Sequence, residues 1–325
     1  MMFMELPATL NGAPKLNQIK NKVNDKKWGD YRSSLKPRYK KVWFDIGFAY
    51  FMLASAVTIC ASIESRLQPG YLFIPILPLG SLWTGFWLHY LLCFFHEATH
   101  YNIFSNRKYN DWAANLLIGS LIGLGIKSYR KTHWLHHANL GTTGDTETSY
   151  FEPLKIKRLA LDLAGRYQFN ILLRYFKKAA EEHFAPSNSR LALAISSLVH
   201  LGIFLGLLIS GYPLTGLMWL AGFSSFYPMF NRIRQTIEHR SYHASEKIDY
   251  RFVDHGAENR IFGNDLFSRN LGAAGFNRHL LHHWDPALSY TQFDAMEKFM
   301  MQTQYRAMIS ARRTTYWKAL RDFLK

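Results

Sequence analysis

The histidines of this chain gather in three short boxes whose residue type and spacing indicate a metal site. The boxes read HEATH at 96–100, HWLHH at 133–137 and HLLHH at 279–283. Residues three and four positions apart share one face of a helix, so each box would present its imidazoles together. Eight of the fourteen histidines lie in these boxes: His96, His100, His133, His136, His137, His279, His282 and His283.

The number of imidazoles favours two metal ions. Neutral imidazole binds zinc, copper, iron and nickel, whereas magnesium and calcium prefer oxygen ligands. A tetrahedral ion takes four ligands, so eight imidazoles are too many for one. His239 is a ninth candidate, with Gln235 on the same face of a helix. On the residues alone, these two are equally well explained as polar groups at a membrane boundary.

The apolar residues are concentrated in four blocks that are long enough to cross a bilayer. The blocks cover about 42–63, 71–95, 191–210 and 214–230. A helix needs around 20 residues to cross the roughly 30 Å hydrocarbon core. We therefore expect an all-α integral membrane protein with about four transmembrane helices and a cytoplasmic helical cap that carries the boxes.

The predicted organisation is a single domain, 1–325, with three parts. A basic N-terminal segment, 1–41, precedes the spans. The spans lie within 42–230, interrupted by an insertion at 127–190, and a C-terminal region follows at 231–325.

The distribution of basic residues predicts the orientation of the chain. Ten Lys or Arg lie in 15–41 and eleven in 127–190, whereas the short connections at 65–70 and 211–213 hold only Arg66. By the positive-inside rule, both termini and the insertion face the cytoplasm. All three boxes, and with them the active site, then fall on the cytoplasmic side. The net charge of +16 is explained by this orientation and by anionic headgroups, so no nucleic-acid partner is expected.

The order and spacing of the boxes resemble the integral-membrane fatty acid desaturase and hydroxylase superfamily. Its signature has the forms HxxxH, HxxHH and HxxHH, and the likeness extends over about 44–286. Flanking residues add to it: Asn110–Asp111, Tyr129–Arg130, Gly144–Asp145 and Asp285–Pro286. The first box has three residues between its histidines and the third begins with histidine, which is closer to the acyl-lipid, sphingolipid and carotenoid-modifying branches.

The resemblance implies a di-iron centre held by the eight box histidines and by His239, which matches a further family ligand near the end of a span. Gln235 stands where some members have an asparagine. The implied reaction uses dioxygen and reducing equivalents to desaturate a fatty acyl or other lipid chain. A lipid or carotenoid hydroxylase or ketolase of the same superfamily is the alternative, and zinc could be incorporated in place of iron.

The implied partners are a lipid or acyl substrate, dioxygen and a separate electron donor such as ferredoxin or cytochrome b5, because the chain has no HPGG-type cytochrome motif. The basic cytoplasmic face would attract an acidic carrier. Breaking an unactivated C–H bond exceeds the ability of acid and base side chains, which is consistent with a redox metal.

Carboxylates close to the boxes are candidates to support the ligands. A ligating histidine commonly donates its other ring N–H to such a group. The candidates are Glu97, Asp145, Glu238 and Asp285, together with the amide of Gln235. Each carboxylate is equally explained as a solvated loop residue or a helix cap.

A rival function comes from the first box, which is a literal HExxH motif. In metalloproteases this motif binds zinc through two histidines and activates water with the glutamate. An intramembrane zinc protease would leave the second and third boxes without a role.

His200 and His255 lie outside the three boxes. His200, within the third apolar block, is expected to be a neutral packing residue, and His255, in a polar segment, is expected to face solvent.

Overall fold

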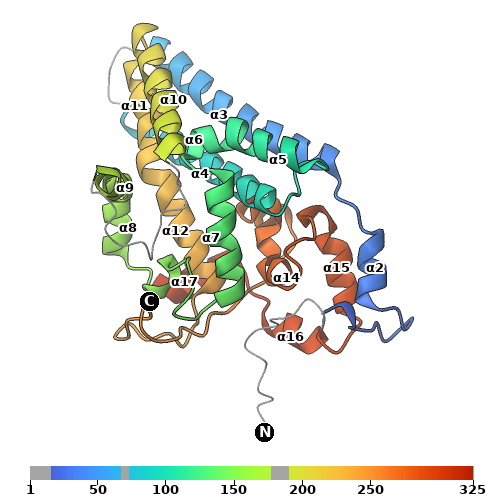
Figure 1. Cartoon of the computed structure of the whole chain (residues 1–325). Helices are drawn as coiled ribbons and strands as arrows, with labels where there is room; N and C mark the ends of the chain where they lie inside the picture. Colours follow the sequence, from blue (N-terminus) through green and yellow to red (C-terminus); the bar gives the residue numbers. More distant parts are fainter. Residues whose placement is uncertain (1–15, 67–72, 177–189, 325) are drawn as a thin grey trace. The chain divides into compact units, whose positions relative to one another are not determined.

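The computed structural model describes residues 16–66, 73–176 and 190–324, and their regular structure is helical (Figure 1). Two isolated β-bridges, Lys20 with Lys27 and Ile261 with Arg313, are the extended pairings within these ranges. The all-α prediction is therefore confirmed for the described part of the chain.

The chain forms two compact units, which are described separately. Unit 1 comprises Met1–Lys41, His133–Pro153 and Gln235–Lys325. Unit 2 comprises Val42–Thr132 and Leu154–Arg234. Three helices contribute residues to both units: α3 (Tyr39–Arg66), α7 (Ile126–Asn139) and α12 (Tyr227–His239).

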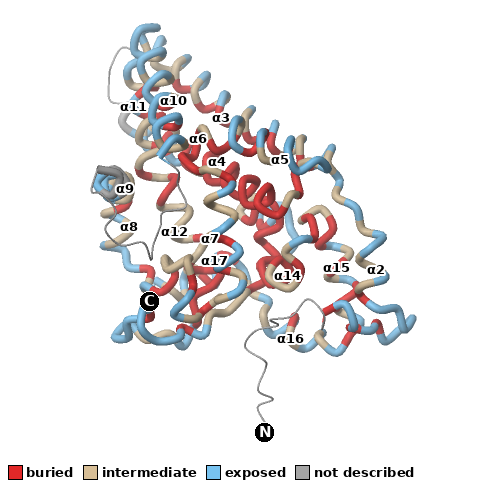
Figure 2. Tube along the Cα trace, viewed as in Figure 1, coloured by how far each residue is buried: buried red, intermediate tan, exposed pale blue. Residues whose placement is uncertain are grey.

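Three helices are long and apolar enough to cross a membrane. They are α3 (Tyr39–Arg66), α4 (Phe73–Thr99, with the apolar span from Pro75) and α10 (Arg190–Ile209). Much of the surface of α3 and α10 is exposed (Figure 2), including the apolar side chains of Phe44, Leu198 and Ile209. Large exposed apolar surfaces on helices of this length are suited to contact with lipid. The first three predicted spans are confirmed as candidate crossings.

The fourth predicted span is divided by a π-helical turn. The segment consists of α11 (Pro213–Ala221), η4 (Gly222–Phe226) and the start of α12. Gly222 packs closely against α4, since a Cβ there would lie 2.7 Å from the Cβ of Thr84. The π-helix occurs mostly as a single-turn bulge within an α-helix. A fourth crossing at 214–230 therefore remains a prediction.

The rest of unit 2 consists of short helices. These are α5 (Arg107–Ala113), the π-helical η1 (Ala114–Gly119), α6 (Ser120–Ile122), α8 (Ile156–Leu163) and α9 (Arg166–Phe176). Within this unit α10 and α11 lie side by side (Figure 1). Arg130 joins three of its segments by donating to the Thr99 carbonyl at 2.8 Å and to Asp111 on α5 at 2.9 Å.

Unit 1 is built around α14 (His279–Trp284), which carries the third histidine box. Trp28, on α2 (Trp28–Ser34), belongs to a buried apolar cluster with Leu281 of α14 and Phe299 of α15 (Phe293–Met300). The remaining elements are η2 (Ser149–Phe151), α13 (Leu266–Leu271), η5 (Ala273–Arg278), η6 (Tyr290–Gln292), α16 (Arg306–Ala311) and α17 (Tyr316–Leu324). This packing fixes the helix that positions three of the predicted ligands.

Candidate metal centre

Seven of the nine predicted ligands lie in unit 1, on three helices. The second box is on α7, His239 is the last residue of α12, and the third box begins α14. Helical spacing turns the imidazoles of α7 and of α14 to one side of each helix, as the sequence predicted. Five of the seven are buried, with His136 only 1% exposed, and the other two, His137 and His283, are half-buried.

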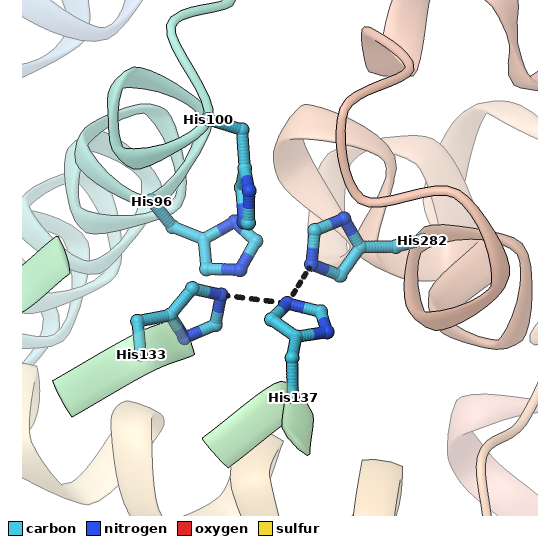
Figure 3. Close-up of side chains that lie close together, drawn as sticks. All are labelled: His96, His100, His133, His137 and His282. Carbon is cyan, nitrogen blue, oxygen red and sulfur yellow. Dashed lines mark hydrogen bonds between the residues drawn. The ribbon is translucent and has the colours of Figure 1, made fainter. Parts of the chain in front are cut away.

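One group of imidazoles joins the second box to the third. The Nε2 atom of His137 lies 2.9 Å from Nε2 of His133 and 3.0 Å from Nε2 of His282. In Figure 3 these three rings point toward one another, with His133 and His137 on one helix and His282 on another. We call this trio the first cluster. Residues 145 positions apart in the chain therefore present the same ring atom to one point.

A second group joins α12 to α14. The Nε2 atom of His279 lies 2.9 Å from Nε2 of His239 and 3.1 Å from Nε2 of His283. His136, His239 and His283 also form a group whose potential ligand atoms all lie within 4.8 Å of one another. We call these four histidines the second cluster. His137 and His283 connect the two clusters, with ring centroids 4.4 Å apart.

The electrostatics of the clusters favour a bound cation. Burial, reinforced by the neighbouring imidazoles of His137 and His279, lowers the pKa of His283 well below its ordinary value. A ring that stays neutral offers the lone pair that a metal requires. Converging lone pairs would repel one another without a cation or a shared proton between them. The imidazole donors therefore suit transition-metal ions, and the presence of two clusters suits two such ions.

The Asp145 carboxylate contacts Nδ1 of His136, and its role in supporting a metal ligand remains a prediction. Its Oδ1 atom lies 2.8 Å from Nδ1 of His136 and accepts the backbone N–H of Glu147 at 2.8 Å. Its Oδ2 atom accepts the phenolic O–H of Tyr150 and the backbone N–H of Gly141. A carboxylate on Nδ1 fixes the tautomer in which Nε2 carries the lone pair that a metal would bind.

Glu147 has the same relation to His133, and the sequence reasoning missed it. Its Oε1 atom lies 3.2 Å from Nδ1 of His133. Burial alone would raise the pKa of Glu147, but His136 and the hydrogen-bonded His133 hold that pKa well below its ordinary value. The available signal was an acidic residue two positions after Asp145, which the loop turns to the same side.

Gln235 supports Glu147. Its Nε2 atom donates to Oε2 of Glu147 at 3.2 Å, and its Oε1 atom accepts the hydroxyl of Ser149. The amide therefore acts one step further from the imidazoles than the carboxylates do. Glu238 differs, because its fully buried Oε2 atom lies 3.8 Å from Nε2 of His279, the ring atom that faces the cluster. Glu238 is thus placed as a potential ligand beside His239 and His279.

Asp285 does not occupy the predicted position behind a histidine. Its Oδ2 atom accepts the indole N–H of Trp28 at 3.3 Å and the Nε–H of Arg32 at 3.0 Å, and its Oδ1 atom accepts a second Arg32 donor at 3.3 Å. This corrects the prediction for Asp285. Within the described residues, a bidentate arginine takes up the carboxylate, so Asp285 ties the end of α14 to α2 instead.

The first box lies on the last turns of α4, in unit 2. His96 and His100 are buried, and their rings pack edge to face with centroids 5.1 Å apart. Both are labelled in Figure 3. Glu97, between them in the sequence, is fully buried. Their inclusion in a common ligand set with the other seven histidines, and a supporting role for Glu97, remain predictions.

The comparison with protein families decides the family to which this site belongs. The model described as Fatty acid desaturase matches residues 72–315, which include all three boxes and His239. The chain belongs to the fatty acid desaturase family. A search of curated proteins finds no match to the chain.

Membership in the desaturase family accounts for all three boxes, whereas the zinc-protease alternative uses the first box alone. The match gives that alternative no support. Desaturase family membership implies an oxidoreductase that is associated with membranes and acts on lipid, which agrees with the three candidate membrane helices.

Two histidines outside the desaturase boxes have environments of a different kind. His200 is buried in α10, where Nε2 bonds the Leu121 carbonyl at 2.7 Å and Nδ1 accepts the indole N–H of Trp219 at 3.0 Å. This is the packing role that the sequence predicted. His255 was expected to face solvent, but it is only 5% exposed and lies among Tyr150, Phe151 and Tyr250. Aromatic neighbours from distant segments bury it, which its polar sequence context did not indicate.

Proposed function

We propose that this desaturase-family protein is an oxygen-dependent, non-haem di-iron oxidoreductase that desaturates a fatty acyl or other lipid chain. The observation that carries the proposal is the pair of imidazole clusters in unit 1, each formed by Nε2 atoms from two or more helices. Two clusters fit two ions, and imidazole is a ligand that iron accepts.

The proposed ligand set divides between the clusters. His133, His137 and His282 would hold one ion, with His96 and His100 of α4 completing its shell. His136, His239, His279 and His283 would hold the other, with Glu238 beside them. Iron supplies the redox chemistry with dioxygen that protein side chains lack. Asp145 and Glu147 fix the ring orientation of His136 and His133, so both supported rings come from the second box.

The proposed reaction removes two hydrogens from adjacent methylenes. One dioxygen, two electrons and two protons convert the saturated pair into an alkene and two waters. A lipid or carotenoid hydroxylase or ketolase is the second candidate, since the same inputs can place one oxygen atom on carbon as an alcohol, and a second round of them gives a ketone. The family match and the imidazole clusters support both outcomes equally.

The proposed setting follows from the charge distribution. The three candidate spans and a fourth crossing at 214–230 would place both termini and the histidine boxes on the cytoplasmic side. A separate one-electron carrier, such as ferredoxin or cytochrome b5, would supply the electrons. The excess of basic residues would steer an acidic carrier to the protein.

The test is a product assay with isotopically labelled dioxygen. Iron-loaded protein in lipid nanodiscs is given a reduced carrier, a mixture of acyl lipids and ¹⁸O₂, and the lipids are analysed by mass spectrometry. An unlabelled alkene supports desaturation, and an ¹⁸O-labelled alcohol or ketone supports the second candidate. Absence of either product from protein with full iron occupancy would contradict the proposal. His243→Ala, which changes an exposed histidine, is the matched control for alanine variants of the box histidines.

A further inference from the structure

Tyr150 is a buried side chain that the proposed reaction does not use. It belongs to η2 in unit 1 and has no solvent exposure. Its ring lies 5.1 Å from that of His239 and 5.1 Å from that of His255, between centroids, and Phe151 packs against it. The ring therefore lies next to the predicted ligand His239, and its aromatic neighbours shield it from water.

The hydroxyl of Tyr150 is at the end of a hydrogen-bonded chain that leads to the second cluster. The O–H donates to Oδ2 of Asp145, whose Oδ1 lies 2.8 Å from Nδ1 of His136. The same phenolic oxygen accepts the backbone N–H of Gly141 at 2.9 Å. Phenol, carboxylate and imidazole thus form a continuous path, with a proton acceptor already in contact with the phenol.

Ordinary acid and base chemistry does not suit this phenol. Burial, reinforced by the negative charge of Asp145, raises the pKa of Tyr150 well above its ordinary value. Loss of the proton alone would leave a buried phenolate, whereas loss of a proton and an electron together leaves a neutral ring. A phenol that is shielded from solvent and hydrogen-bonded to a carboxylate is suited to such a coupled loss.

We infer that Tyr150 is a redox-active residue that donates one electron to the metal centre when dioxygen has oxidised that centre and no lipid is bound. This inference rests on the proposed function. In the step, the phenolic O–H bond breaks and the proton passes to Oδ2 of Asp145, forming the carboxylic acid. The electron passes to the metal centre, which is reduced by one equivalent, and Tyr150 becomes a neutral phenoxyl radical. The Gly141 N–H keeps its hydrogen bond to the phenolic oxygen throughout.

A second buried aromatic donor in unit 1 is also bonded to a carboxylate but does not share these features. Trp28 donates to Asp285, but Arg32 holds both oxygens of that carboxylate. Asp285 therefore contacts Trp28 and Arg32 rather than a predicted metal ligand. Asp145 instead connects to a predicted metal ligand, which singles out Tyr150 within unit 1.

Tyr250 provides a matched control. It belongs to the same buried aromatic cluster and is 6% exposed, and its ring lies 4.6 Å from that of His255 between centroids. Its hydroxyl accepts the Ser245 N–H at 2.6 Å rather than bonding Asp145. Removing this hydroxyl changes the same aromatic cluster without touching the path to His136.

The experiment is freeze-quench electron paramagnetic resonance on the full-length protein. Protein loaded with ferrous iron is mixed with oxygenated buffer in the absence of lipid substrate, using the unaltered chain, Tyr150→Phe and Tyr250→Phe. We expect an organic-radical signal in the unaltered protein and in Tyr250→Phe, and its loss in Tyr150→Phe. Ring-deuterated tyrosine should narrow the signal. A signal that survives in Tyr150→Phe, or no radical in protein whose iron has been oxidised, would overturn the inference.

Two further measurements separate the possible failures. Iron content and Mössbauer oxidation state are recorded on every sample, so protein that binds no iron or does not oxidise it contradicts the proposed function itself. If Tyr150→Phe loses iron, 3-fluorotyrosine is placed at position 150 in an otherwise unaltered chain. Fluorine hyperfine splitting of the radical supports Tyr150, and an unsplit radical excludes it.

Discussion

His136 in unit 1 and His200 in unit 2 are two buried histidines whose surroundings indicate different roles. Each is at most 3% exposed, and each has a ring nitrogen held by a strong hydrogen bond. Behind His136 is the carboxylate of Asp145, and in front of it are the imidazoles of His239 and His283. His200 contacts a backbone carbonyl, an indole N–H and the ring of Phe223.

The comparison shows which features distinguish a ligand from a packing residue. Burial and satisfied ring nitrogens are common to both, so neither is diagnostic. Of these two histidines, only His136 has a carboxylate on one ring nitrogen and lies in a group of converging imidazoles. A metal explains that convergence, whereas hydrogen bonding alone explains His200.

The largest expected effect is that of removing an imidazole from the second cluster. In His136→Ala we expect complete loss of lipid product, because a ligand and the group that Asp145 orients are lost together. Product formation in nanodiscs, measured at equal protein concentration, tests this. Measurable turnover in His136→Ala would show that His136 is not an essential ligand. His136 would then, like His200, be a packing residue.

Asp145→Asn should have the next largest effect. The amide keeps the size of the side chain but weakens the bond to Nδ1 of His136 and permits the wrong tautomer. Changes of this kind typically cost about 10- to 100-fold in metal affinity or activity. Iron affinity, measured by competition with a chelator, tests the prediction, and an affinity equal to that of the unaltered protein would contradict it.

Glu147→Gln should have a smaller effect than Asp145→Asn. The contact of Glu147 with Nδ1 of His133 is longer, at 3.2 Å, and Asp145 has more hydrogen-bond donors to orient it. We expect a loss of iron affinity near the lower end of the roughly 10- to 100-fold range. The same chelator competition measures it, with Glu246→Gln, an exposed substitution in unit 1, as the control.

His200→Phe should reduce stability without reducing the metal content. The substitution leaves the Leu121 carbonyl and the Trp219 indole N–H without their buried partner. An unsatisfied buried polar group costs about 1–3 kcal/mol. We expect a lower melting temperature in detergent and unchanged iron per chain. Loss of iron from this variant would show that metal binding depends on His200 as well as on His136.

The smallest effect concerns the pH dependence of stability at His255. Burial, assisted by the charge of Arg240, lowers the pKa of His255 to about 4. An unfolded chain binds this proton near about pH 6.5. Between these values the unfolded state holds more protons, so stability falls as the pH is lowered through the window.

His255→Phe should therefore flatten the acid side of the stability profile. The contribution removed between about pH 7 and about pH 5 is on the order of 2 kcal/mol. Melting temperatures recorded from about pH 7 to about pH 5, with His243→Phe as the exposed control, test this. An unchanged slope in His255→Phe would show that another group carries the acid sensitivity.

The sequence was most informative where the determinant is local. Helical spacing alone indicated that α7 and α14 would present their histidines together, and the apolar blocks located α3, α4 and α10. The supporting residues were harder to find, because Glu147 and Tyr150 act through a loop whose path depends on long-range packing. Asp285 was wrongly assigned for the same reason, since α2, some 250 residues earlier in the chain, supplies its partners.

The fourth span illustrates another limit of sequence reasoning. Its composition suits a crossing, but the close approach of Gly222 to α4 coincides with a π turn that divides the helix. Close packing between helices depends on side chains that hydropathy does not report. His255 likewise becomes buried through contacts with residues that lie about a hundred positions earlier.

The most direct test of the account is the metal content of the purified protein. Elemental mass spectrometry on detergent-purified chains gives the identity and number of bound ions for the unaltered protein, His136→Ala and His200→Phe. We predict two transition-metal ions per unaltered chain, a lower number in His136→Ala and no change in His200→Phe. A single ion per unaltered chain, or a content that is the same in His136→Ala, would contradict the two-metal centre.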